Sequence, residues 1–257
     1  MNNNLAILIL AAGKGKRMNN PEIPKVLVKL NNQPLLYYVL SQTQKLEPLK
    51  TVIVVGHKKE QVIEFCNSTD LHSDESPYKI EYAVQHQQLG TGNAVLVSEF
   101  NFDDNDYAVL ILAGDVPLLR AETLSRFIQL HSDSHSDCSV LSTIAPNPFG
   151  YGRIVRDNEG NFLKITEQKD ASEEIKQINE INSGIFLVNS KILFESLKKI
   201  KNNNAQNEYY LTDIVEILKN NNMNVNAFAC AEFNELQGIN TNEELLNAEK
   251  YFLDNYK

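Results

Sequence analysis

Residues 10–18 read LAAGKGKRM, which places two glycines and three cations directly after an apolar run. Glycines let backbone N–H groups approach an anion closely, and lysine and arginine side chains supply the positive charge that holds it. A polyphosphate is therefore the ligand that this loop fits best. The alternative is a solvated, lysine-rich turn after a strand, and the loop alone does not decide between the two. The nearby cations are Lys14, Lys16, Arg17 and Lys25.

Two familiar phosphate-binding patterns do not fit this loop. The P-loop needs four residues between its first glycine and Gly-Lys-Ser/Thr, and that pattern is absent. The dinucleotide-binding fingerprint needs a third glycine where Met18 stands, and Pro21 and Pro24 break the stretch that its helix would occupy. The sequence therefore disfavours a dehydrogenase.

Asp115 is a second residue that could do chemistry, because it follows the apolar run AVLILA within the sequence GDVPL. A carboxylate at the end of a buried strand can reach a metal ion in the crevice beside the sheet. Magnesium commonly takes only one or two protein oxygens and fills its octahedron with phosphates and waters. The competing interpretation of an isolated aspartate in such a turn is a cap or turn former.

The stretch QHQQLGTGNAV, from Gln85, combines amide side chains with a glycine-containing turn. A glutamine amide presents both a donor and an acceptor, which matches the N–H and carbonyl of a uracil edge. Gly90 and Thr91 would let the backbone approach a base or ribose. Without further context the stretch is also compatible with a capped turn before a helix.

Three apolar runs predict the strands that position these residues. They are LAILILAA from Leu5, TVIVV from Thr51 and AVLILA from Ala108, and each is followed by glycine. Continuous rather than alternating apolar runs indicate strands buried on both faces of a parallel sheet. Helix-like segments lie between them, from Pro34 and from Asn93. The fold class expected is α/β, with a Rossmann-like, mixed but mainly parallel central sheet flanked by helices.

The second half of the chain has a different pattern. The stretch from Gly152 predicts two short strands around an Asn-Glu-Gly turn, and the stretch from Ile178 predicts another strand. We therefore expect a single α/β domain whose second half adds a further lobe, built on the same sheet.

Composition excludes several classes of function. A formal net charge of −9 argues against nucleic-acid binding, and the apolar stretch at residues 5–12 is too short to cross a bilayer and lacks a cationic leader. The cysteines have neither metal-site nor disulfide-framework spacing; they are Cys66, Cys138 and Cys230. We therefore expect a cytoplasmic protein.

Eight motifs in chain order resemble those of the sugar-nucleotide pyrophosphorylases, and most closely the uridyltransferase domain of the bacterial bifunctional N-acetylglucosamine-1-phosphate uridyltransferases. The motifs span nearly the whole chain. They are LAAGKGKRM…PKVL from Leu10, QLGTGNA from Gln88, GDVPL from Gly114, GYGRI from Gly150, EQKDA from Glu167, EINSGI from Glu180, NNNAQNEYYLTDI from Asn202 and QGIN from Gln237.

The resemblance implies a single nucleotidyltransferase domain over residues 1–257, with a nucleotide-binding part over about 1–120, a sugar-binding part over about 121–240 and a C-terminal helix over 241–257. It also implies a role for individual residues. It implies that Arg17 and Lys25 contact the phosphates and that Asp115 and Asn240 bind Mg²⁺. Asn240 could instead be the N-cap of the following helix, a role that Thr241 or Asn242 could fill equally well. Thr212 could also be the N-cap of the helix DIVEILK, which is compatible with a sugar contact. The implied nucleotide contacts are Leu10, Ala11, Gly13, Gln85, Gln88, Gly90 and Thr91. The implied sugar contacts are Gly152, Glu167, Asn182, Tyr210 and Thr212.

The chain also departs from the family pattern. Ala113 stands where a tyrosine usually precedes GDVPL, Asn93 replaces a usual histidine, and Asn207 replaces a usual glycine. One more residue than is common separates Arg17 from Lys25. The hexapeptide repeats of the bifunctional proteins are absent, so we expect neither acetyl transfer to glucosamine-1-phosphate nor the trimer that those repeats form.

The sequence thus predicts an enzyme that joins UTP and N-acetylglucosamine-1-phosphate, with Mg²⁺, to give UDP-N-acetylglucosamine and pyrophosphate. Because of Ala113, the alternative within the class is another sugar-1-phosphate or nucleoside triphosphate. An alternative from another class is a non-catalytic sugar-nucleotide-binding regulator, which would not need the set of cations and metal ligands. The partners expected are these small molecules, with no nucleic acid and no membrane; the sequence does not specify an oligomeric state.

Overall fold

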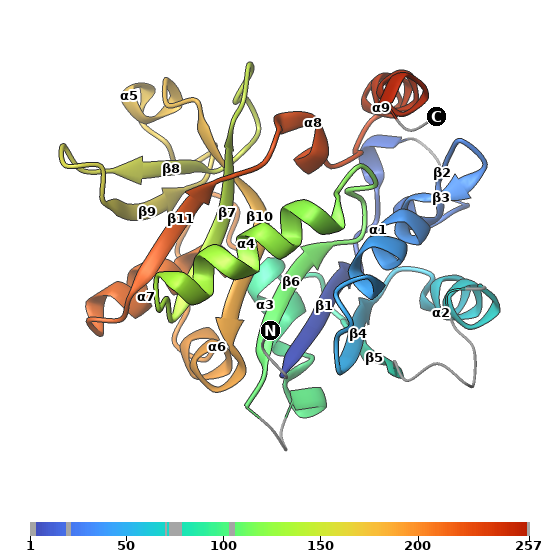
Figure 1. Ribbon diagram of the computed structural model, residues 1–257, viewed down its shortest axis with the longest axis horizontal. Coiled ribbons are helices and arrows are strands. Elements are labelled where there is room, and N and C mark those ends of the chain that lie inside the picture. Colours follow the sequence, from blue (N-terminus) through green and yellow to red (C-terminus); the bar gives the residue numbers. More distant parts are fainter. Residues whose placement is uncertain (1–3, 19–21, 70, 72–78, 103–105, 256–257) are drawn as a thin grey trace.

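The computed structural model describes residues 4–18, 22–69, 71, 79–102 and 106–255, so Pro21 lies outside the described residues. A nine-stranded sheet forms the centre of the molecule, and a short hairpin of β2 and β3 lies beside it (Figure 1). The strands of the sheet are β1 Leu5–Ala11, β4 Lys50–Val55, β5 Lys79–Val84, β6 Ala108–Ala113, β7 Cys138–Ile144, β8 Arg153–Arg156, β9 Phe162–Thr166, β10 Glu180–Asn189 and β11 Val225–Ala229; the hairpin is β2 Lys29–Leu30 and β3 Gln33–Pro34.

The strand order is β11-β7-β10-β6-β1-β4-β5, with β8 paired to β10 and β9. β1 lies between β4 and β6 and is parallel to both, while β10 is antiparallel to β6 and β7. The predicted mixed, mainly parallel sheet is confirmed, and the strands of the second half extend the sheet of the first. Because the chain places β4 on one side of β1 and β6 on the other, a crevice forms at their carboxyl ends.

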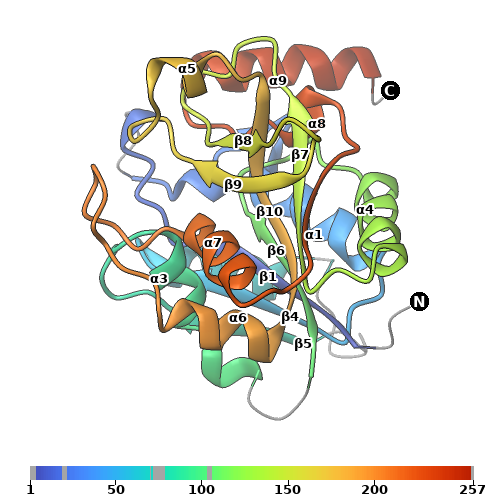
Figure 2. The ribbon, with the colours of Figure 1, turned by 90° about the vertical axis from the view of Figure 1, so that its left-hand side faces the viewer.

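Helices cover both faces of the sheet (Figures 1 and 2). On one face α1, α2 and α4 pack against side chains such as Ile7 and Ile9, and on the other α3, α6 and α7 pack against side chains such as Leu8. This two-sided burial explains the continuous apolar runs. The helices are α1 Leu35–Gln44, α2 Lys59–Ser68, α3 Thr91–Leu96, α4 Ala121–Asp133, α5 Glu173–Lys176, α6 Ser190–Leu197, α7 Ile214–Asn220, α8 Phe233–Leu236 and α9 Asn242–Asn255.

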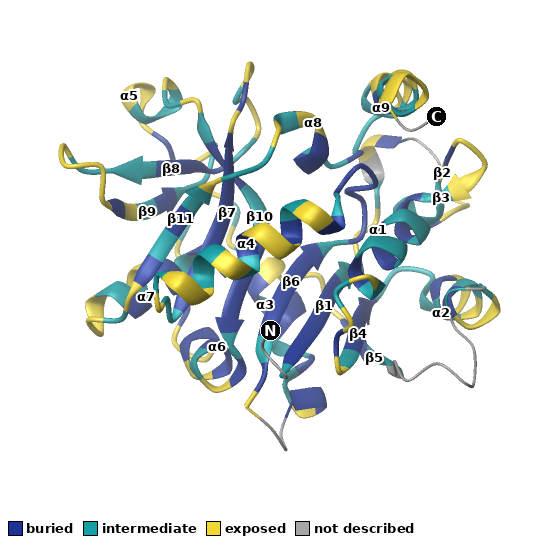
Figure 3. Ribbon diagram, in the orientation of Figure 1, coloured by how far each residue is buried: buried dark blue, intermediate teal, exposed yellow. Residues whose placement is uncertain are grey.

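Burial follows this layering (Figure 3). The middle strands are buried, whereas the outer faces of α4 and α9 are exposed. Short 3₁₀ turns complete the chain at Lys16–Met18, Lys25–Leu27, Glu99–Phe102 and Leu211–Asp213. Within the ranges described above, no helix combines the length and apolar character needed to cross a membrane.

The predicted hairpin from Gly152 is present as β8 and β9. Their turn is closed by a hydrogen bond from the N–H of Gly160 to the carbonyl of Asp157, at 3.0 Å, and Gly160 has a φ of +85°. The predicted C-terminal helix is present as α9. It packs through Ala248 against a small cluster that also contains Met18 of the glycine loop. The last helix therefore supports the loop that carries the cations.

Candidate active site

Lys25, Asp115 and Asn240 meet at the carboxyl ends of β1 and β6. The ammonium of Lys25 donates hydrogen bonds to Oδ2 of Asp115 and to Oδ1 of Asn240, the latter at 2.9 Å. Asp115 follows β6 directly and is 8% exposed. Gly15 packs against Lys25, because a Cβ at Gly15 would lie 2.7 Å from Lys25 Cβ. The glycine loop thus holds the lysine against the carboxylate.

The local structure around Asn240 leaves its side-chain oxygen free to face a cation. Thr241 caps α9, since its hydroxyl accepts from the N–H of Glu244 at 3.2 Å, and Glu244 accepts in return from the N–H of Asn240 and of Thr241. The amide nitrogen of Asn240 donates to the carbonyl of Gly238 at 3.1 Å, so its oxygen faces Lys25. Of the alternatives for the helix cap, Thr241 is the one present.

The donor set at this position fits magnesium. One carboxylate oxygen and one amide oxygen converge on a single cation, here the Lys25 ammonium. Within the part of the chain that the structure describes, no group of three or more His, Cys, Asp or Glu side chains gathers into a metal site. Two oxygen ligands with no thiolate or imidazole suit Mg²⁺, which keeps waters and binds substrate phosphates, and do not suit zinc.

The remaining residues of the glycine loop surround this cluster. Leu10 and Ala11 end β1, and Gly13 is exposed, with open space where a Cβ would stand. Arg17 lies in the 3₁₀ turn Lys16–Met18 and is exposed. The loop is therefore open to an approaching anion on the side that carries Arg17.

The nucleotide-side loop, residues 85–91, follows β5. Gln88 donates from its amide to the carbonyl of Ala12 at 2.6 Å, which joins this loop to the glycine loop. A cavity of about 330 Å³ opens here, at the ends of β4 and β5, and Lys14, His57 and Gln85 are among its lining residues. Gln85 is 6% exposed. The structure thus brings Gln85 and Gln88 to the same cavity beside the glycine loop.

The same loop is joined to the segment that carries the predicted sugar contacts. The N–H of Tyr209 donates to Leu89, and its carbonyl accepts from Gly92, both at 2.8 Å. The hydroxyl of Thr91 accepts from the N–H of Leu211 at 3.0 Å. Thr91 therefore uses its side chain to join the two segments, and its nucleotide contact stays a prediction.

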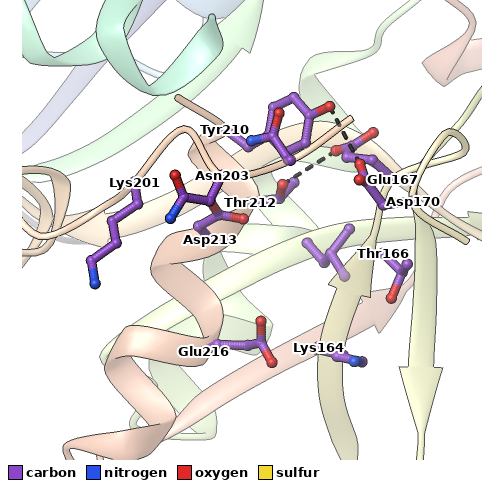
Figure 4. A pocket seen from close by; sticks show the side chains of 12 residues that line it. Lys164, Thr166, Glu167, Asp170, Lys201, Asn203, Tyr210, Thr212, Asp213 and Glu216 are labelled. Carbon is purple, nitrogen blue, oxygen red and sulfur yellow. Dashed lines mark hydrogen bonds between the residues drawn. The ribbon is translucent and has the colours of Figure 1, made fainter. Parts of the chain in front are cut away.

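A second cavity, of about 370 Å³, lies between β9 and α7 and carries three of the predicted sugar contacts: Glu167, Tyr210 and Thr212 (Figure 4). The hydroxyl of Thr212 donates to Oε1 of Glu167 at 3.2 Å, and that of Tyr210 donates to Oδ2 of Asp170 at 3.4 Å. The alternative role of Thr212 as a helix cap is wrong. It lies inside the 3₁₀ turn Leu211–Asp213, and α7 begins at Ile214.

Gly152 and Asn182 lie at the edge of this group. The N–H of Asn182 donates to the carbonyl of Gly152 at 2.9 Å. A Cβ at Gly152 would lie 3.3 Å from both carboxylate oxygens of Glu167 and 3.0 Å from Ile165. An alanine at this position would require the side chains of Glu167 and Ile165 to give by a few tenths of an ångström.

Carboxylates dominate the electrostatics of this cavity. Burial raises the pKa of Glu167, and the negative charges of Asp170 and Asp213 raise it further, while the hydrogen bond from Thr212 lowers it. Burial also raises the pKa of Asp213 to about 6, with contributions from the charges of Glu216 and Asp170. Lys164 and Lys201 also line the cavity, but the carboxylates outnumber them. Such a site can accept hydrogen bonds from neutral hydroxyl and amide groups.

Sequence analysis missed several residues that shape the site. Arg153 is 1% exposed and donates to Oε1 of Gln168 at 2.8 Å, and Gln168 also accepts from the N–H of Gly150. The ring of Tyr151 packs edge-on against Phe233, with 6.0 Å between the ring centroids. Burial raises the pKa of Tyr151 to about 12; the charges of Glu244 and Asp115 raise it further, whereas the charge of Arg17 lowers it. Arg153, Gln168 and Tyr151 were present in the quoted motifs GYGRI and EQKDA, which was the signal available.

The central mixed, mainly parallel sheet is flanked by helices, and the glycine loop, Asp115 and Asn240 lie at the carboxyl ends of its parallel strands. This arrangement defines the class as the nucleotide-diphospho-sugar transferase fold. Two solved structures share this fold. A UDP-glucose pyrophosphorylase in complex with UDP-glucose matches with a TM-score of 0.77 and 18% identity, covering 98% of this chain and 99% of that one. HddC from Yersinia pseudotuberculosis matches with a TM-score of 0.70 and 19% identity, over 96% of this chain and 99% of its own.

The chain belongs to the nucleotidyl transferase family, whose pattern it matches over residues 6–234. The bifunctional protein GlmU of Streptococcus mutans is 42% identical over 243 residues, which are 95% of this chain and 50% of that protein. GlmU of Caldanaerobacter subterraneus subsp. tengcongensis is 43% identical over 246 residues, 96% of this chain and 51% of its own. The chain therefore spans about half the length of these relatives, and the family resemblance seen in the sequence is confirmed.

Proposed function

We propose that this protein transfers a uridylyl group from UTP to N-acetylglucosamine-1-phosphate, with Mg²⁺, and releases pyrophosphate. The observation that carries the proposal is the convergence of Lys25, Asp115 and Asn240 on one cation position beside the glycine loop. The 42% identity to GlmU over 95% of the chain supports the choice of UTP and of the N-acetylated sugar.

The reaction needs positioned charge rather than a protein nucleophile. A phosphate oxygen of the sugar phosphate forms a bond to the α-phosphorus of UTP, and the bond from that phosphorus to the pyrophosphate oxygen breaks. Negative charge grows on the attacking and leaving oxygens as this happens. Lys25 and Arg17 would stabilise that charge, and the open loop around Gly13 would supply backbone N–H groups to the triphosphate.

Asp115 and Asn240 would hold the Mg²⁺ ion. When bound, the ion would supply positive charge that neutralises the negative charge developing on the phosphate oxygens. The two ligands come from opposite halves of the chain, after β6 and before α9, so the complete fold is needed to place them.

The sugar would lie toward the second cavity. Glu167 and Thr212 are already paired there and can accept from and donate to sugar hydroxyls. Gly152 and Asn182 offer backbone and amide groups beside them. Tyr210 supplies a ring that can pack on an apolar sugar face or an acetamido methyl. A cavity rich in carboxylates disfavours a second phosphate at this end, so the phosphate of the sugar would point to the cations.

The partners proposed are these two small molecules, with neither nucleic acid nor membrane. Cys66, Cys138 and Cys230 are free thiols, which supports a cytoplasmic location. The proposed parts of the single domain remain about 1–120 for the nucleotide, about 121–240 for the sugar and 241–257 for the C-terminal helix.

The decisive experiment measures pyrophosphate release with UTP and Mg²⁺, with N-acetylglucosamine-1-phosphate and glucose-1-phosphate in parallel. We expect rapid release with the N-acetylated sugar only. Release with glucose-1-phosphate alone would keep the reaction and replace the substrate, an outcome that Ala113 makes worth testing. The absence of release with any sugar phosphate and nucleoside triphosphate would favour a non-catalytic binding protein.

Asp115→Asn provides the matched test of the metal site. The change keeps the shape of the side chain and removes its charge, so we expect turnover to fall by about a hundredfold or more while the fold is retained. Circular dichroism checks the fold. A variant that retains near-normal, magnesium-dependent turnover would remove Asp115 from the metal site.

A further inference from the structure

The side-chain amide of Gln85 has both of its donor positions engaged. Its nitrogen, Nε2, donates to the carbonyl of Gly90 at 3.2 Å and to Oδ1 of Asn93 at 3.0 Å. A primary amide has two N–H groups, so these two acceptors use them both. The polar atom of Gln85 that is left for a ligand is the carbonyl oxygen, Oε1.

The orientation of this amide is fixed by its surroundings. The backbone carbonyl of Gly90 can only accept, so the atom of Gln85 that faces it must be the nitrogen. Gly90 is held in place on both sides, because the carbonyl of Leu89 accepts from the N–H of Tyr209 and the N–H of Gly92 donates to the carbonyl of Tyr209, both at 2.8 Å. A flipped amide would place its oxygen against two acceptors, which is unfavourable.

Gln85 lines the cavity of about 330 Å³ beside the glycine loop, together with Lys14 and Gln88. This cavity lies at the carboxyl ends of β4 and β5, where a nucleotide held by the loop would place its base. An acceptor on its wall pairs with a ring N–H, which uracil carries at N3. Cytosine carries a lone pair at the same ring position, so two acceptors would face each other.

We propose that Asn93 is a positioning residue that fixes the Gln85 amide so that Gln85 offers the nucleobase an acceptor and no donor. Among pyrimidines this arrangement selects a base with a ring N–H over cytosine. Asn93 does this from the first turn of α3, without contacting the base. The inference rests on the proposed function in one respect, which is that the bound substrate is a nucleotide.

The test is calorimetric titration of the full chain with UTP and with CTP, in the presence of Mg²⁺ and without any sugar phosphate. We expect UTP to bind more tightly than CTP. Asn93→Leu removes the acceptor for Gln85 at similar volume and should lower the UTP-to-CTP affinity ratio by about fivefold, the worth of one hydrogen bond. Asn93→Asp keeps an acceptor and should keep the ratio within about twofold.

The ratio separates positioning from a merely structural role, since general damage to the site weakens both nucleotides equally. The proposal is overturned if the wild-type protein binds CTP as tightly as UTP or binds neither. It is also overturned if Asn93→Leu leaves the UTP-to-CTP affinity ratio unchanged, or if Asn93→Asp lowers that ratio as much as Asn93→Leu does. Asn93→Ala replaces Asn93→Leu if the larger side chain prevents folding. Failure of the proposed function would show separately, as an absence of pyrophosphate release. The titration does not measure pyrophosphate release, so the two failures can be told apart.

Discussion

At the scale of single residues, the ion pair between Lys25 and Asp115 is the central electrostatic interaction of the site. Its side chain is 16% exposed and that of Asp115 is 11% exposed, so the pair is largely withdrawn from water. The ammonium contacts the two oxygens that a divalent cation would need. A metal ion held by these oxygens would therefore have to displace the lysine, which would then be free to reach a phosphate. Removing one partner of such a pair leaves a buried charge without compensation.

We expect Lys25→Met to lose turnover and yet to bind a divalent cation more tightly in the absence of nucleotide. The reason is that a neighbouring positive charge changes the cation affinity of a carboxylate by about tenfold or more. Mn²⁺ binding, followed by electron paramagnetic resonance, measures this directly. Lys29→Met, an exposed lysine on the nearby hairpin, is the control and should leave Mn²⁺ affinity unchanged. Unchanged or weaker Mn²⁺ binding by Lys25→Met would contradict the displacement.

At the scale of secondary-structure elements, hydrogen bonds connect the two proposed substrate regions. The start of α3 and the segment 209–211 are joined by hydrogen bonds from Gly92, Tyr209 and Leu211, at 2.8, 2.8 and 3.0 Å. The loop that leads into α3 carries Gln85 and Gln88, and the segment 209–211 contains Tyr210 and is followed by Thr212. A displacement of either segment is therefore transmitted to the other, and damage at the junction should affect both substrates.

Gly90→Ala tests this coupling. The substitution strains a backbone with a φ of +112° and drives a methyl group to 2.5 Å from the Tyr209 carbonyl, so the two segments must separate. We expect KM to rise for both substrates, by about tenfold or more for a site misplaced by a fraction of an ångström. Gly160→Ala is the matched control, because its φ is +85° but nothing lies within 4 Å of the added methyl. A rise in KM for one substrate alone would show that the segments act separately.

The sequence predicts the elements better than it predicts the contacts between them. Continuous apolar runs located β1, β4 and β6, because burial on both faces leaves no alternation, and the motifs placed chemistry at the ends of these strands. Sequence spacing could not reveal that Lys25 pairs with Asp115 and Asn240, which are 90 and 215 positions away. Thr212 was misassigned as a possible cap for the same reason, since its partner Glu167 is 45 positions away.

Charge is segregated across the whole molecule. The chain has a formal net charge of −9, yet Lys14, Arg17 and Lys25 gather around the glycine loop. Carboxylates outnumber cations at the cavity of Figure 4, which is lined by Glu167, Asp170, Asp213 and Glu216 and also by Lys164 and Lys201. An anionic nucleotide is therefore drawn to one end of the crevice and kept from the other. The carboxylate cluster also has a consequence for stability.

Asp213 should make the folded state more stable at low pH than at neutral pH. Its pKa is raised from the ordinary value of 3.8 to about 6 by burial and by the charges of Glu216 and Asp170, so the folded state binds the proton more tightly. This contribution to the free energy of unfolding is complete below the ordinary pKa and is lost as pH rises through about 6. Burial lowers the pKa of His131, so this residue makes the folded state less stable as pH falls, opposite to Asp213. The melting of the wild-type protein alone therefore cannot isolate the contribution of Asp213.

Comparison with Asp213→Asn removes the contribution of His131, which is common to both proteins and cancels. It leaves the effect of the Asp213 charge, including the part by which that charge raises the pKa of Glu167. We expect the variant to melt at a higher temperature than wild type above about pH 6.5, by a few degrees. The difference should shrink between about pH 6 and pH 4 and vanish below that range, as Asp213 becomes protonated and resembles the amide. Differential scanning calorimetry from pH 4 to pH 8 measures it, with the exposed Asp254→Asn as control. A difference in melting temperature that stays constant with pH, or a variant that is less stable than wild type at pH 7.5, would show that the charge of Asp213 does not destabilise the folded state.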